Sequence, residues 1–291
     1  MGPIAKKLAA ALRKHKNQKV VDLAAFTVGK SQAGESAKTI ATPKELSSLH
    51  PAHALYVYAQ NIVSFLSEQI TQLREMHRFA KVLGPAEETY MPGGPPMSPL
   101  TGSYFTCWAF FDACVGAAEE TIGSCILDVG RILNLDDELL RIISLMQASR
   151  MGLFVRVGVD GENIVLRELL TDREVEAVNP TGYVGSEEEI LLVRVLPPAD
   201  PKSQEHVIFT TPYAIVRPGI AEWVEYLMRT TEKMGGRGDL GAYEKLMKYG
   251  PERNYWNEYI FEAYLNHSTD SIFLAGLPDV EGSRPHARKN W

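Results

Sequence analysis

Apolar residues recur at steps of three and four through the first half of the chain, a spacing typical of amphipathic helices. Four helices follow from this pattern, over residues 3–16, 52–83, 104–133 and 139–150. The polar stretch 29–51 reads as a linker, and Gly84-Pro85 is expected to end the second helix. The Pro- and Gly-rich stretch 84–103 then forms a long loop.

Small residues follow one another at seven-residue intervals along the third predicted helix. They are Gly102, Ala109, Gly116, Gly123 and Gly130. Each glycine inside a helix costs about 1 kcal/mol relative to alanine, so a row of them needs a structural reason. Small residues let helix axes approach closely. We therefore expect Gly116, Gly123 and Gly130 to form a helix-packing stripe against the helix over 52–83.

From Met151 the apolar period changes to two, which is typical of strands. Five strands are predicted, over 151–159, 163–169, 173–178, 189–196 and 206–216. Asp160-Gly161 supplies a tight hairpin turn between the first two. Short strands at this spacing favour a small, mostly antiparallel barrel, and the pattern resembles barrels of the SH3 or OB type in architecture alone.

The last third returns to helical spacing, over 219–234, 241–249 and 254–267, before an apolar run at 272–277 and a polar tail at 278–291. The predicted fold class is α+β: an N-terminal helical bundle, a small antiparallel β-barrel-like module and C-terminal helices. The expected domains are a basic arm and linker, a helical domain, the β-module, and the C-terminal helices with their tail. Their boundaries are 1–51, 52–150, 151–218 and 219–291.

Charge is distributed unevenly. The first thirty residues contain one acidic residue, Asp22, and seven basic ones: Lys6, Lys7, Arg13, Lys14, Lys16, Lys19 and Lys30. This arm carries +6 and the rest of the chain −12, because the whole chain carries −6. A basic arm on an acidic body favours an anionic partner or the acidic face of a second copy. We expect the arm to be a tether, dispensable for folding, that binds through Lys6, Lys7, Arg13 and Lys14.

Composition narrows the class of protein. A hydrophobic fraction of 45 % and a charged fraction of 23 % are usual for a globular chain. Three cysteines without a C-x-x-C spacing, and an N-terminus without a signal-like apolar run, favour reduced thiols in the cytoplasm. The most apolar stretch, 103–118, contains Asp112 and is shorter than the roughly 20 residues that a membrane span needs. No membrane contact and no cofactor are expected.

Asp112 and Glu119 are seven residues apart in the third predicted helix, each four residues before a glycine. Buried acids are costly unless they are paired or protonated. One interpretation is a catalytic pair with raised pKa values in a pocket under the 84–103 loop. The alternative, which we favour, is that an arginine pairs with them. The candidates are Arg131, Arg141 and Arg150.

Other motifs have simpler explanations. Ala24-x4-Gly29-Lys30-Ser31 matches a relaxed phosphate loop, but no strong strand precedes it and no apolar helix follows. Three cysteines share one predicted helical face without a neighbouring histidine, which favours a core over a metal site: Cys107, Cys114 and Cys125. His267, near Ser268 and Asp270, matches no triad signature.

The C-terminal helices are rich in aromatic residues, and Tyr255, Trp256 and Tyr259 exceed what one buried face would hold. Aromatic enrichment is typical of interfaces. The first functional hypothesis is therefore a non-catalytic binding or assembly protein that acts through protein–protein contacts or self-assembly. The second is a hydrolytic enzyme that uses Asp112 and Glu119. The third is a nucleic-acid-associated protein that uses the basic arm.

Overall fold

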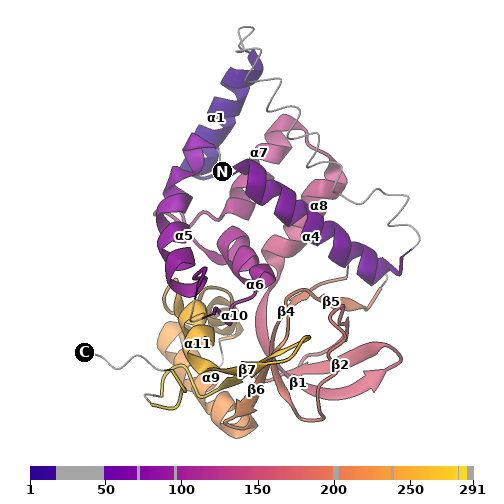
Figure 1. Cartoon of the computed structure of the whole chain (residues 1–291). Coiled ribbons are helices and arrows are strands. Elements are labelled where there is room, and N and C mark those ends of the chain that lie inside the picture. Colours follow the sequence, from indigo (N-terminus) through magenta and orange to yellow (C-terminus); the bar gives the residue numbers. More distant parts are fainter. Residues whose placement is uncertain are drawn as a thin grey trace. The chain divides into compact units, whose positions relative to one another are not determined.

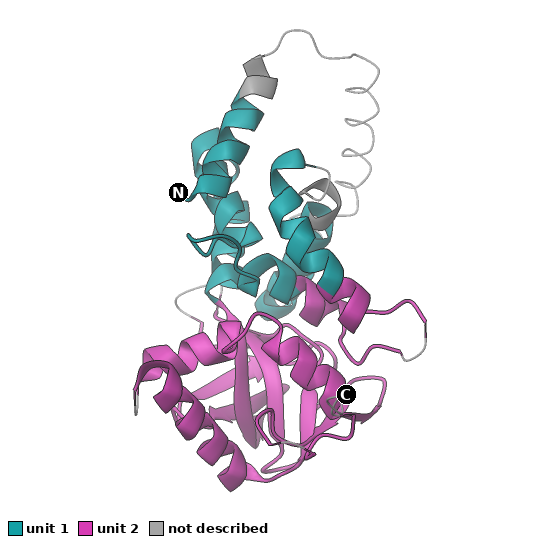
Figure 2. Cartoon of the chain, turned by 90° about the vertical axis from the view of Figure 1, so that its left-hand side faces the viewer, with its two compact units in different colours: residues 1–85, 107–148 teal, residues 86–106, 149–291 magenta. Residues whose placement is uncertain are grey.

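A computed structural model describes residues 1–17, 49–70, 73–94, 97–198, 203–236, 239–280 and 282–286. Two compact units emerge, the first formed by residues 1–85 and 107–148 and the second by residues 86–106 and 149–291 (Figure 2). Each unit gathers segments that are separated in the sequence.

The first unit is helical (Figure 1). Its elements are α1 (Pro3–Asn17), α4 (Pro51–Ile70), the 3-10 turn η1 (Arg74–Met76), the start of α5 (His77–Tyr90), the π-helical turn η2 (Trp108–Asp112), α7 (Ile122–Leu133) and α8 (Asp137–Ala148). α1 packs on α7 and η1, α7 packs on α8, and α8 packs on α4. The predicted short helix at the N-terminus and the predicted helix before the strands are confirmed by α1 and α8.

The single helix expected over 52–83 is wrong. α4 ends at Ile70, a 3-10 turn follows, and α5 continues through Gly84-Pro85 to Tyr90. Proline removes one helical hydrogen bond, so it usually ends a helix. Here the buried positions Phe79, Ala86 and Tyr90, spaced by seven and four, carry one helical face across the proline.

The single helix expected over 104–133 is also wrong. α6 (Gly102–Cys107) leads into η2, and a tight turn then precedes α7. Gly116 has φ +78° and Glu119 has φ +49°, left-handed values that no helix contains, and a bridge pairs Val115 with Glu120. No helix of the described residues is long and apolar enough to cross a membrane.

The second unit contains an eight-stranded sheet whose first five members close into a barrel, with order β1-β2-β3-β5-β4 and a β1–β4 pairing. β6, β8 and β7 extend the sheet from β4. The strands are β1 (Arg150–Asp160), β2 (Asn163–Glu168), β3 (Glu174–Val178), β4 (Ile190–Leu196), β5 (His206–Ile208), β6 (Tyr213–Arg217), β7 (Tyr264–His267) and β8 (Ile272–Ala275). The barrel is mixed, because β3 and β5 pair in parallel.

Alternate side chains along the strands fill the interior of the barrel. Ile164 and Leu166 from β2, and Leu191 and Val193 from β4, belong to one buried cluster, as their period of two requires. The predicted hairpin is confirmed, since Asp160 pairs with Asn163 and Gly161 takes φ +60°. A glycine at the first position of a two-residue turn suits the twist of the strands it joins.

Two predicted elements each divide into two. The strand over 206–216 becomes β5 and β6, because Pro212 cannot donate to a ladder. The helix over 254–267 becomes α11 (Tyr255–Ala263) and β7, which gains backbone pairing with β8. The other C-terminal helices are α9 (Ile220–Gly235) and α10 (Leu240–Tyr249). The α+β class is confirmed, with N-terminal helices, a five-stranded barrel with extra strands, and C-terminal helices.

The polar tail is held in place at its described residues, 278–280 and 282–286. Arg284 forms an ion pair with the buried Glu262 of α11, with 2.6 Å between nitrogen and oxygen. The Ser283 hydroxyl donates to the carbonyls of Leu277 and Val280. These contacts hold the chain after β8 against the C-terminal helices.

Candidate functional site

α9 has two opposite faces. Its buried side chains recur at steps of one and three: Trp223, Tyr226, Leu227, Thr230 and Thr231. A second set of side chains lies two positions after the buried ones, and therefore about 200° around the helix. This set consists of Glu225, Met228, Arg229 and Glu232. One face therefore enters the core and the other faces away from it.

A pocket of about 530 Å³ lies on this outward face. α9, the turn after β2 and the start of α10 supply its lining, which consists of Leu170, Glu225, Met228, Arg229, Thr231, Glu232, Asp239 and Leu240. We call it the α9–α10 pocket. Met228 is 42 % exposed and Leu240 59 %, so two large apolar side chains face solvent at one site.

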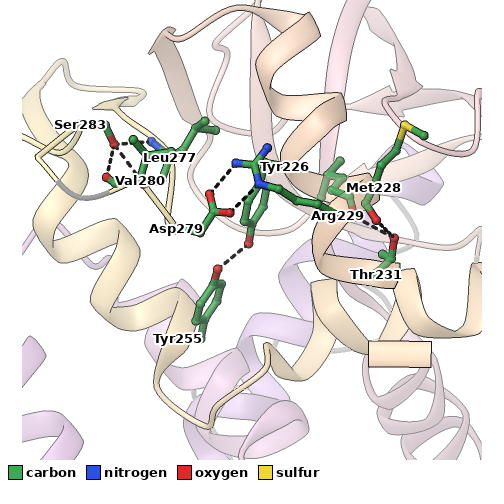
Figure 3. A network of polar contacts seen from close by, with 10 residues as sticks. Tyr226, Met228, Arg229, Thr231, Tyr255, Leu277, Asp279, Val280 and Ser283 are labelled. Atoms are coloured by element: carbon green, nitrogen blue, oxygen red, sulfur yellow. Dashed lines mark hydrogen bonds and ion pairs between the residues drawn. The ribbon is translucent and has the colours of Figure 1, made fainter. Parts of the chain in front are cut away.

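Arg229, the one arginine among the described residues of the lining, is already neutralised. The Arg229 guanidinium donates two hydrogen bonds of 2.7 Å to the Asp279 carboxylate, in a two-point ion pair (Figure 3). It also lies 5.6 Å from the centroid of the Tyr226 ring. The hydrogen bonds to Asp279 raise the pKa of Arg229 further. Arg229 is thus held in place by its own chain.

Unlike Arg229, the acidic residues of the lining are not neutralised by an ion pair within the described part of the chain. Among the described residues, none forms an ion pair with Glu225, Glu232 or Asp239. Asp239 accepts a hydrogen bond of 2.8 Å from the Gly241 N–H and so caps α10. The described lining therefore combines apolar side chains with three carboxylates, those of Glu225, Glu232 and Asp239, which we call the acidic rim.

The polar groups under the pocket form hydrogen bonds with other groups of the same chain. The Tyr226 and Tyr255 hydroxyls lie 2.7 Å apart (Figure 3). Burial raises the pKa of Tyr255 to about 12, so this phenol stays neutral at physiological pH. The Thr231 hydroxyl donates to the Leu227 and Met228 carbonyls of its own helix. None of these hydroxyls points to acid–base chemistry.

Of the three aromatic residues expected at an exposed contact surface, Trp256 and Tyr259 lie in the core and Tyr255 is half-buried. Trp256 is 4 % exposed and its indole N–H donates to the Leu246 carbonyl at 2.7 Å. Tyr259 is 1 % exposed and its hydroxyl donates to the Gly276 carbonyl at 3.1 Å. Edge-to-face ring contacts join them to each other and to Trp223 and Tyr255. These internal partners account for the aromatic enrichment, so the enrichment alone is no evidence of an interface.

The carboxylate pair does not share a helical face. Asp112 is buried at the end of η2, whereas Glu119 is exposed in the turn before α7. Neither lines the α9–α10 pocket, nor the hollows of about 520 Å³ at the α7–α8 connection and about 130 Å³ beside β3. The premise of the hydrolase hypothesis, one helix that carries both acids, is therefore wrong.

Glu120, which sequence reasoning passed over, is the acid with the most defined role in the first unit. Its carboxylate accepts hydrogen bonds of 2.9–3.1 Å from the Ile4 and Ala5 N–H groups, at the start of α1. A helix N-terminus favours a negative charge. Burial and this carboxylate raise the pKa of Cys125 to about 12, so Cys125 stays a thiol.

The hydrogen bonds of Ile4 and Ala5 to Glu120 place the start of the basic arm, residues 1–30, in the folded first unit. Lys6, Lys7 and Arg13 are exposed, as binding residues would be, and the Lys14 side chain lies outside the described residues. Ile4 and Leu8 of the same helix are buried in the first unit. α1 is thus part of a folded unit and not a free tether, while residues 18–30 lie outside the described part of the chain.

The glycine stripe is partly as expected. A Cβ on Gly123 would meet Gln147 Oε1 at 2.5 Å and the Phe111 ring at 2.6 Å, and a Cβ on Gly130 would meet Leu140 at 2.5 Å. These two glycines do permit close packing, but against η2 and α8 and not against α4. Gly116 lies in the exposed turn with no atom within 4 Å of an added Cβ, so its predicted packing role is wrong.

A buried ion pair joins β1, β2 and α10. The Arg150 guanidinium donates to Glu168 Oε1 at 2.6 Å, and the Tyr243 hydroxyl donates to the same oxygen at 3.1 Å. Burial alone would raise the pKa of Glu168, but Arg150, aided by the Thr171 hydroxyl, outweighs it and lowers the pKa. Each partner is occupied, so we assign this cluster to stability.

The remaining candidates also have structural explanations. His267 contacts the Tyr264 hydroxyl, while the Ser268 hydroxyl donates to Asp270, so no triad forms. In the described part of the chain, no group of three or more His, Cys, Asp or Glu side chains is placed to hold a metal ion. The phosphate-loop match at residues 24–31 lies outside that part.

The sequence pattern predicts α9 within one residue of its observed ends, but the role of its outward face was not predicted. The signal was a methionine between two glutamates seven residues apart on a helix whose opposite face is apolar. Leu170 and Leu240 carry no comparable signal, because only the folded chain brings them beside α9. No protein-family model, curated protein or solved structure matches the chain.

Proposed function

We propose that this chain is a non-catalytic binding protein that holds a segment of a partner protein in the α9–α10 pocket. The observation that carries the proposal is the exposure of Met228 and Leu240 at one site. Contiguous apolar surface rimmed by polar groups is typical of interaction sites. Exposed methionine favours such a role further, because its unbranched side chain adapts to different apolar partners.

The lining gives little support to catalysis at this pocket. Its described residues include no serine, cysteine, histidine or lysine. Arg229 is engaged by Asp279, the Thr231 hydroxyl by its own helix, and Asp239 by the α10 N-terminus. A hydroxyl nucleophile needs an activating base within reach, and the one hydroxyl of the described lining, that of Thr231, donates to the carbonyls of its own helix instead.

A display library of helical and extended segments with random charge tests the proposal. The library is selected on the wild-type chain and then counter-tested on a Met228→Asp/Leu240→Asp double variant. Val216→Asp is the matched control, because Val216 is 58 % exposed and does not line the pocket. Both changes are at exposed sites, so the melting temperatures should stay close to that of the wild type.

We expect selected clones to bind the wild type and the Val216→Asp control, and to lose at least about tenfold in affinity for the double variant, a change of about 1.4 kcal/mol. Clones that bind all three chains equally, or a selection that enriches none, would overturn the proposal. Self-association of the wild type that the double variant abolishes would overturn it too, by assigning the pocket to a second copy.

A further inference from the structure

We infer that the segment held in the α9–α10 pocket is a cationic amphipathic helix; this rests on the proposed function. The negative charge of the acidic rim indicates the sign of the partner's charge. Glu225, Glu232 and Asp239 line the pocket without an ion pair to any described residue, and Arg229, the one cation among the described lining residues, is held by Asp279. A partner with basic groups complements this rim, and one with acidic groups is repelled.

The spacing along α9 points to the form of the partner. Glu225 and Glu232 are seven residues apart, about 10 Å along the helix axis, and Met228 lies between them on the same face. A partner helix that lies along α9 with basic residues at positions i and i+7 reaches both glutamates. Its apolar residue at i+3 or i+4 then meets Met228.

The walls of the pocket argue against an extended partner. α9 and α10 supply most of the lining, and the turn after β2 supplies Leu170. An extended segment gains its affinity from backbone hydrogen bonds to an open strand edge, whereas a helix gains it from apolar anchors in a groove. This pocket offers anchors and no strand edge.

The rim also separates the inference from other macromolecules. Nucleic acids and anionic membranes carry dense negative charge, so the same carboxylates that attract a basic helix repel them. Leu240, which is 59 % exposed, stands at the α10 end of the pocket and offers a second apolar contact. The charge of the acidic rim and the seven-residue spacing of Glu225 and Glu232, rather than one side chain, therefore define the class of partner.

Three synthetic helical peptides with one shared apolar stripe and positive, zero or negative net charge test the inference on the full-length chain. We expect the cationic peptide to bind at least about tenfold more tightly than the neutral one, the ratio that 1.4 kcal/mol produces. The preference should shrink between about 0.1 M and about 1 M salt, as the Debye length falls from roughly 10 Å to roughly 3 Å.

Charge reversal supplies the matched comparison. Glu225→Lys/Glu232→Lys should reverse the order, so that the anionic peptide binds more tightly. Glu222→Lys/Glu252→Lys changes the net charge equally at exposed residues that do not line the pocket, and should preserve the order. A reversal by both double variants would show that overall charge and not the pocket selects the peptide, and would overturn the inference.

The outcomes separate the inference from the proposed function. If library clones bind at the pocket but the three peptides bind equally, or only the anionic one binds, the cationic class is wrong and the binding function stands. If a DNA duplex or an anionic vesicle binds instead, and Met228→Asp/Leu240→Asp abolishes that binding, the cationic helix is also wrong. If neither clones nor peptides bind, both proposals fail.

Discussion

Glu119 and Glu120 are neighbours in the sequence but face different surroundings. Glu119 is exposed in the turn before α7, whereas Glu120 is 6 % exposed and accepts the first N–H groups of α1. The sequence pattern drew attention to Glu119 because of its spacing from Asp112. Residues seven apart share a face only within one continuous helix. The predicted helix is interrupted between Asp112 and Glu119, so their spacing does not place them on one face.

This contrast makes a first prediction. Glu120→Gln should lower the free energy of unfolding by about 2 kcal/mol, because hydrogen bonds to a charged group are worth about 1.5–3 kcal/mol and an amide accepts through one oxygen only. Glu119→Gln should change it by less than about 0.5 kcal/mol, as at other exposed sites. Urea denaturation of both variants checks this, and equal effects would contradict the assignment of Glu120 as the cap of α1.

The glycines give a second prediction, because two of them are required for different reasons. Gly123→Ala should destabilise by about 1–3 kcal/mol through overpacking against Phe111 and Gln147. Gly116→Ala should cost about 1–2 kcal/mol through its φ of +78° alone. Asparagine tolerates the left-handed region, so Gly116→Asn should recover part of the loss and Gly123→Asn none. Recovery at both positions in thermal melts would argue against the packing role of Gly123.

The lowered pKa of Glu168 gives a third prediction. An acid whose pKa is lower in the folded chain stabilises above its unfolded pKa of about 4.3, and this stabilisation is lost as the pH falls through the folded value. Glu168→Gln should therefore cost about 3–5 kcal/mol at neutral pH, because Arg150 stays buried without its partner. The difference from the wild type should narrow below about pH 4. A difference that widens on acidification would contradict the ion pair.

At the scale of elements, the sequence predicted what depends on local period. The strands β1 to β4 and the helices α8, α9 and α10 came within a few residues of their observed ends, because alternation and helical spacing act over neighbouring positions. The breaks were missed. Gly116 turns the chain in the middle of an apolar run, and β7 leaves a helical pattern because it pairs with β8. Pairing with a distant strand leaves no trace in local spacing.

The same reasoning explains what was missed at the site. Met228 and the two glutamates around it are visible in the sequence as one face of a helix. Leu170, Asp239 and Leu240 join them only through the fold. Tyr255, Trp256 and Tyr259 were expected at a surface because one helix cannot bury them all on one face. Contacts of α11 with α9, with α10 and with the C-terminal segment after β8 supply the further burial.

The contacts of that segment make a fourth prediction. A chain that ends at Leu277 loses the ion pairs Arg229–Asp279 and Arg284–Glu262, and leaves the Glu262 carboxylate buried without its arginine. It should unfold at a lower temperature by several degrees, and its loss of stability should be about 3–5 kcal/mol. A chain that ends at His286 is the control and should melt like the full chain. Equal melting of all three would show that residues 278–286 contribute nothing to the fold.

At the scale of the whole molecule, net charge and local charge point to different partners. The chain carries −6, and the described basic side chains of α1 are exposed at Lys6, Lys7 and Arg13. Binding through these residues remains a prediction. The described lining of the α9–α10 pocket has the opposite sign, and the partner proposed for it is basic. Two surfaces of opposite sign on one chain also make self-assembly a necessary control in any binding experiment.

Site-specific photo-crosslinking tests the central claim most directly. A photoreactive phenylalanine analogue is placed at Met228 in one chain and at Val216 in another, both at exposed positions of the second unit. Each chain is illuminated with the cationic helical peptide. We predict crosslinked peptide from position 228, suppressed by excess unlabelled peptide, and none from position 216. Crosslinking of equal yield at both positions, or at position 216 alone, would contradict the claim that the α9–α10 pocket is the binding site.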